Sequence, residues 1–178
     1  AQGLSGRDNS VLSICARDSE GNTFVHDIKV LSAVDKETKD FTEQCREIIH
    51  ACAYHKISHV YVEENFSATL ANELRKVARE MKVMVQVIAE FRSKNKMVFI
   101  AQTLEPLIKV GRMFVHERVK ETPFMDELQA FPQPRVHDDC IDATSGAISH
   151  LPNLAVDVSK VAKVFNPLQR SGSSFKIN

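Results

Sequence analysis

The sequence predicts a three-layer α/β domain in which a mixed β-sheet is flanked by helices. Two β-rich runs, residues 10–18 and 23–34, are joined by "SEGN", whose Gly21-Asn22 is typical of a tight turn. From residue 40 onward, helical and strand patterns alternate. A hairpin requires antiparallel pairing, whereas strand-helix-strand alternation requires parallel pairing with right-handed crossovers, so we expect both kinds in one sheet.

The elements between residues 40 and 90 follow from hydrophobic periodicity. Apolar residues recur at helical spacing from Phe41 to Cys52, which predicts a helix over 40–55. "HVYVEEN", residues 59–65, is a strand that ends in acids. Ser67 can cap a second helix, whose apolar face ends near Met81, and residues 83–90 form the next strand.

The second half contains shorter elements. Residues 94–111 predict a helix perturbed near Pro106, and residues 111–119 an extended or strand-like piece. A short helix over 123–131 and the loop "PQPR" precede a last helix, which begins in the acidic cluster and ends near His150 because Pro152 follows. We expect one domain over 1–150 and a loosely attached tail over 151–178.

Composition narrows the class of protein. The chain has 178 residues, 43% of them hydrophobic, and lacks the roughly 18 consecutive apolar residues of a membrane span. Its four cysteines form no C-x-x-C pair, so buried thiols in a reducing compartment are expected rather than a zinc site or disulfides.

Basic residues concentrate in the middle of a chain whose net charge is zero. Residues 75–120 hold eleven Lys and Arg against four Glu, a local net charge of +7. This segment either binds a polyanion or forms a solvated helix face. The candidate DNA-binding residues within it are Arg75, Arg79, Lys82, Arg92, Lys94 and Lys96.

The acidic cluster "HDDCIDA", residues 137–143, contains the candidate catalytic residues. Asp138 is explained as a helix cap, whereas Asp142 lies about a turn inside the helix and shares a face with Asp139. Glu63 and Glu64 end a strand and point to opposite faces, so only one can reach a given site. Converging carboxylates suit Mg²⁺ or Mn²⁺, and two such ions can promote phosphodiester hydrolysis. A set of solvated surface acids is the alternative.

Three segments, "VYVEENFSATLANEL", "TLEPLIKVGRMFV" and "HDDCIDATSGAI", resemble in order and spacing the C-terminal nuclease domain of bacteriophage terminase large subunits. The resemblance covers roughly residues 1–150 and implies an RNase H-like fold, with Glu63, Asp139 and Asp142 as catalytic metal ligands for Mg²⁺ or Mn²⁺, two ions in all, and Asp138 as a lesser ligand. In that family a first strand ends in a catalytic Asp. Here Asp8 matches a second, later Asp of the family pattern, so the first strand is expected before Ala1. The alternative is that Asp8 itself is the catalytic Asp.

The resemblance also implies a role and partners. It implies cleavage of concatemeric double-stranded viral DNA during genome packaging in the host cytoplasm, away from the membrane. The partners would be the terminase ATPase domain, the small terminase subunit and the portal; the ATPase motif G-x-x-x-x-G-K-[ST] does not occur in this sequence. Two alternatives stay open: a nuclease like the Holliday-junction resolvases, and a non-catalytic module that grips DNA or docks in a packaging motor.

Overall fold

The computed structural model describes residues 10–31, 41–63, 69–92, 95–133 and 137–152. The predictions made for Asp8, Glu64, the capping Ser67, Lys94 and most of the tail lie outside these residues. Within them, no helix has the length and apolar character needed to cross a membrane.

The first sheet contains the predicted hairpin. Strands β1 (Ser10–Arg17) and β2 (Thr23–Leu31) pair antiparallel, and β5 (Met113–Val115) adds to β2 in parallel. In the connecting turn the N–H of Gly21 donates to the carbonyl of Asp18, and Gly21 has φ +87°, a conformation that glycine adopts without strain. The expected mixture of antiparallel and parallel pairing is confirmed.

A second pair of strands lies beside this sheet. Strands β3 (His59–Glu63) and β4 (Gln86–Glu90) are parallel and in a register that places Glu63 opposite Glu90. The described strands thus form two hydrogen-bonded sets, ordered β1-β2-β5 and β3-β4, instead of the single continuous sheet expected from the sequence.

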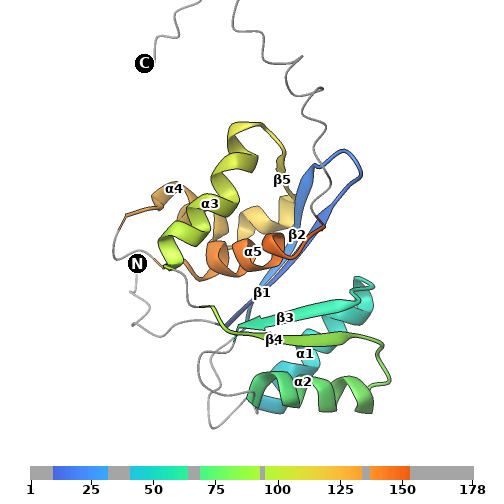
Figure 1. Ribbon diagram of the computed structural model, residues 1–178. Coiled ribbons are helices and arrows are strands. Elements are labelled where there is room, and N and C mark those ends of the chain that lie inside the picture. Colours follow the sequence, from blue (N-terminus) through green and yellow to red (C-terminus); the bar gives the residue numbers. More distant parts are fainter. Residues whose placement is uncertain (1–9, 32–40, 64–68, 93–94, 134–136, 153–178) are drawn as a thin grey trace, which may run out of the picture.

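Helices cover both sets of strands (Figure 1). Helices α1 (Phe41–Tyr54) and α2 (Thr69–Glu80) pack together beside β3 and β4. The other half of the domain holds α3 (Lys96–Lys109), the 3₁₀-helix η1 (Glu117–Glu121), α4 (Phe124–Ala130) and α5 (Asp139–Ser149). Asn95 caps α3, and that helix continues through Pro106 to Lys109.

The hydrophobic core has two parts. One lies between α1, α2 and the β3-β4 pair, and the other between β2, α3, α4 and α5. Strand β2 joins them, because Leu31 belongs to the first part and Val25 and Ile28 to the second.

The predicted thiols are free, and three of the four are buried. Burial raises the pKa of Cys15 and Cys52 to about 11 and that of Cys140 to about 12. These cysteines are therefore packing residues and not nucleophiles at neutral pH.

Candidate active site

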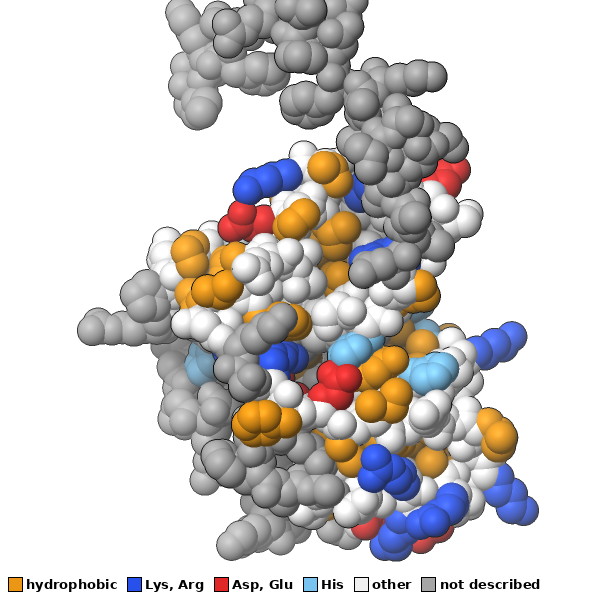
Figure 2. Space-filling view, in the orientation of Figure 1, with side chains coloured by type: hydrophobic (Ala, Val, Ile, Leu, Met, Phe, Trp, Pro, Cys, Tyr) orange, Lys and Arg blue, Asp and Glu red, His pale blue; other side chains and the backbone are white. Residues whose placement is uncertain are grey.

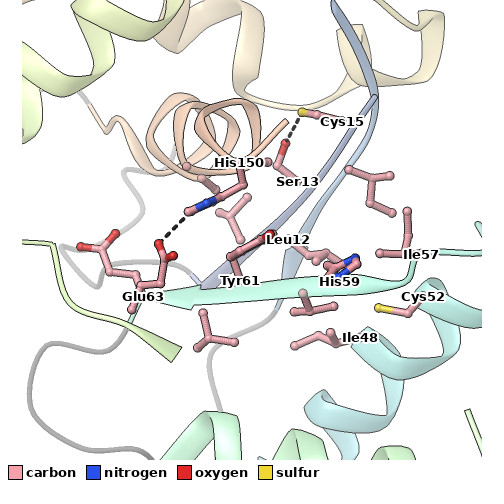
Figure 3. Close-up of a pocket in the computed structure, with 18 of the residues that line it drawn as sticks. Leu12, Ser13, Cys15, Ile48, Cys52, Ile57, His59, Tyr61, Glu63 and His150 are labelled. Carbon is pink, nitrogen blue, oxygen red and sulfur yellow. Dashed lines mark hydrogen bonds and ion pairs between the residues drawn. The ribbon is translucent and has the colours of Figure 1, made fainter. Parts of the chain in front are cut away.

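A cavity of about 790 Å³ separates the two sets of strands. Its walls include consecutive residues of β1, Ser10–Cys15, and consecutive residues at and before β3, Lys56–Glu63. Side chains on a strand alternate between its faces, so a cavity that meets every residue meets the strand along its edge. The cavity is thus a slot between one edge of β1 and one edge of β3, with side chains from both strands directed into it (Figure 3).

Acidic side chains gather at one end of this slot. Glu63 is the last residue of β3, and Glu90 is the last of the neighbouring β4. Asp139 and Asp142 come from the first turn of α5 and line the same cavity. The structure therefore brings together Glu63, Asp139 and Asp142, three of the four predicted catalytic residues, whereas the fourth, Asp8, is outside the described residues.

Two cations lie among these acids. The Arg92 guanidinium joins the two halves of the site, with Nη2 at 2.8 Å from Glu63 Oε2 and Nη1 at 2.5 Å from Asp142 Oδ1. Lys96 Nζ lies 2.8 Å from Asp138 Oδ1 and 3.4 Å from Asp142 Oδ2. Burial lowers the pKa of Lys96, but Asp138 and Asp142 together outweigh it and raise the pKa above its usual value.

The start of α5 is capped by a residue that the sequence did not indicate. Asp138 occupies the N-cap position, but its side chain makes no capping hydrogen bond and pairs with Lys96 instead. The buried carboxylate of Glu127, on α4, accepts hydrogen bonds from the backbone N–H groups of Cys140 at 2.8 Å and Ile141 at 3.0 Å. The prediction that Asp138 caps this helix through its side chain is wrong, because Glu127 already fills that place.

Three further residues of the site were missed. His150 Nε2 lies 2.7 Å from Glu90 Oε2, and its ring stacks on Tyr61 with centroids 3.7 Å apart (Figure 3). These contacts tie the end of α5 to β3 and β4. The position of Glu90 could have been predicted, since it ends a strand as Glu63 does and the carboxyl ends of parallel neighbours meet at one edge. Tyr61 and His150 had no comparable pattern.

The donor set suits a hard divalent cation. Carboxylate oxygens are the ligands that Mg²⁺ and Mn²⁺ prefer, and the Arg92 and Lys96 cations show that positive charge is accommodated between these acids. In the described part of the chain, however, no three His, Cys, Asp or Glu side chains lie close enough to hold a metal ion. The chemistry of these residues fits such an ion, and in the present arrangement two basic side chains lie among them.

The predicted DNA-binding residues fall into two groups. Arg75 and Arg79 lie exposed on α2, and Lys82 lies exposed just after it. Figure 2 shows Lys and Arg side chains at the lower edge of the molecule, in the region where Figure 1 draws α2. Arg92 and Lys96 belong instead to the acidic end of the slot. The +7 segment is therefore not one continuous patch in the described residues.

Comparison with known proteins gives one family match. The model of the family described as "Terminase Bacteriophage T7, Ribonuclease H-like domain" matches residues 4–113. Among solved structures, the chain is similar to the yeast mitochondrial Holliday junction resolvase Ydc2, with a TM-score of 0.48 and 12% sequence identity over 80% of this chain and 74% of that one. A search of curated proteins found no match.

Proposed function

The chain belongs to the family of RNase H-like domains typified by the bacteriophage T7 terminase, and from this premise we propose that it is a divalent-metal-dependent endonuclease that cuts double-stranded DNA. The observation that supports the proposal most is the convergence of Glu63, Asp139 and Asp142 at one end of the slot. These acids come from the end of a strand and the start of a helix, two rigid elements on which a catalytic site can be held precisely.

Each acid has a proposed part in the reaction. Glu63, Asp139 and Asp142 would hold two Mg²⁺ or Mn²⁺ ions, since two-ion chemistry is typical of phosphodiester hydrolysis. Bound there, the ions would activate water and stabilise the leaving oxygen. Asp138 is a weaker ligand candidate because, unlike Asp139 and Asp142, it does not line the cavity, and Asp8 is proposed as an auxiliary ligand.

The proposed biological role is cleavage of concatemeric viral DNA during genome packaging in the host cytoplasm. The proposed partners are the ATPase domain of the terminase, the small terminase subunit and the portal. These proposals derive from family membership.

A cleavage assay tests the enzymatic proposal. We expect Mn²⁺ or Mg²⁺ to support cutting of linear and supercoiled plasmid DNA with little sequence preference, and EDTA to stop it. A four-way junction should be cut no faster than a linear duplex of the same length. Selective cutting of the junction would favour the resolvase alternative, and binding of DNA without cutting in any metal would favour the grip module.

The basic residues of α2 and of the turn after it should contribute to DNA binding through phosphate contacts. Each Lys or Arg that neutralises a phosphate steepens the dependence of log K on log salt by about 0.9. We expect the double variant Arg79→Gln, Lys82→Gln to lower that slope by between about 1 and 2, measured by fluorescence anisotropy. Arg75 is a poorer choice because it donates to the Val87 carbonyl at 2.9 Å and so has a structural role. An unchanged slope would mean that these basic residues only form a solvated helix face and do not contact phosphates.

A further inference from the structure

Arg92 lies between Glu63 and Asp142, two of the three acids that are proposed to hold a divalent cation. We propose that Arg92 is a resident counterion of the metal-free site, and that metal binding requires its guanidinium to leave Glu63 and Asp142. The inference rests on the proposed metal-dependent function and deepens it by naming the group that the ions displace.

The guanidinium is held by contacts on several sides. Its two terminal nitrogens bind carboxylates from opposite halves of the domain, Glu63 at the end of β3 and Asp142 on α5. Its central carbon lies 4.2 Å from the centroid of the Phe99 ring, a cation-π contact. Only 19% of the Arg92 side chain is exposed, so this cation is held in the site and is not a freely moving surface group.

The same contacts account for the lack of a formed metal site among the described residues. Among the described residues, no group of three possible ligands is close enough for a metal, although three acids line one end of the slot. The group that stands between two of them is Arg92. Mg²⁺ requires oxygen ligands at about 2.0 to 2.1 Å, which leaves no room for a guanidinium between the same two carboxylates.

Gly146 makes room for Arg92 in this position. It lies one turn after Asp142 on α5, and a Cβ atom added there would be 2.9 Å from Nη2 of Arg92. The atom that must move is the far end of a flexible side chain, so an alanine should shift the guanidinium and leave the helix intact. Alanine also favours a helix relative to glycine. Gly146→Ala therefore disturbs the counterion without removing any charge.

Calorimetric titration with Mn²⁺ tests the proposal in the whole chain. We expect Arg92→Gln to bind Mn²⁺ at least about 10-fold more tightly than the parent. In the parent, metal binding must first break the charged contacts of Arg92, which raises the dissociation constant by about one to two powers of ten. Gly146→Ala should also bind more tightly, by a smaller factor. In the double variant, Gly146→Ala should add nothing to Arg92→Gln, because its effect acts through the arginine. Arg46→Gln, which removes an exposed arginine paired with Glu43, should bind like the parent.

The outcomes separate this inference from the proposed function. Equal Mn²⁺ affinity in the parent and in Arg92→Gln would overturn the counterion role while leaving a metal site in place. Tighter binding in Arg92→Gln together with no change in Gly146→Ala would also overturn it, since net charge alone would then explain the gain. No saturable Mn²⁺ binding in any variant would overturn the proposed metal dependence itself. If Arg92→Gln fails to fold, Gly146→Ala still decides the question, because it keeps every charge.

Discussion

Asp142→Asn and Glu63→Gln should each lower the rate of DNA cleavage about 100-fold or more. Each change keeps the shape of the side chain and removes the negative charge that a metal ligand must carry. Second-layer groups around metal sites already cost 10- to 100-fold when they are removed, and single groups that stabilise transition-state charge cost about 100- to 1,000-fold. The rate should be measured on supercoiled plasmid in Mn²⁺ at saturating protein.

The same experiment needs evidence that the fold is kept. Asp142 binds both Arg92 and Lys96, so its amide variant also removes one ion pair from each of these cations. Circular dichroism melting should therefore accompany each assay. Glu43→Gln is the matched control, because Glu43 is half-exposed on α1, pairs with Arg46 and lies away from the slot. If a folded Asp142→Asn variant cleaves DNA as fast as the parent, this face of α5 is not part of the catalytic site.

Most of the elements could be predicted because their patterns are local. The hairpin, the stripe from Phe41 to Cys52 and the strand ending at Glu63 depend on alternation, helical spacing and turn residues, and the structure confirms each of them. The RNase H-like fold followed from motif order, and the family match confirms it. Such patterns lie within the residues of the element itself, so each element can be predicted without knowledge of its neighbours in the fold.

The separation of the strands into two sets could not be predicted from periodicity. The alternation of side chains in a strand indicates that the segment is extended and which side chains are buried. It does not indicate which strands pair with one another. The slot between the edges of β1 and β3 is therefore known from the structure alone.

The side-chain contacts within the site also could not be predicted from the sequence. Arg92 was assigned to DNA binding on charge alone, whereas its position depends on Glu63 and Asp142, which lie 29 and 50 residues away along the chain. Glu127 gave no signal because a capping carboxylate supplied by another helix has no fixed spacing from the helix that it caps. Local capping rules therefore pointed to Asp138.

Glu127→Ala should be the most destabilising single change at the site, lowering the free energy of unfolding by about 2 to 5 kcal/mol. It removes the acceptor for two backbone N–H groups at the start of α5, on residues Cys140 and Ile141, which are 1% and 0% exposed. A buried donor left without a partner costs about 1 to 3 kcal/mol. Urea unfolding followed by circular dichroism gives the value directly.

Two further variants test why Glu127 matters. Burial raises the pKa of Glu127, while hydrogen bonds from Ile141 and Cys140 oppose that rise, so the charge of the carboxylate is less important than its oxygen acceptor. Glu127→Gln keeps one acceptor oxygen and should cost less than Glu127→Ala. Asp138→Ala should cost under about 1 kcal/mol, since Asp138 makes an ion pair with the partly exposed Lys96 and no side-chain capping bond. If Asp138→Ala proved more costly than Glu127→Ala, the cap of α5 would lie at Asp138 after all, and the acids of the site would be positioned by their own helix rather than by α4.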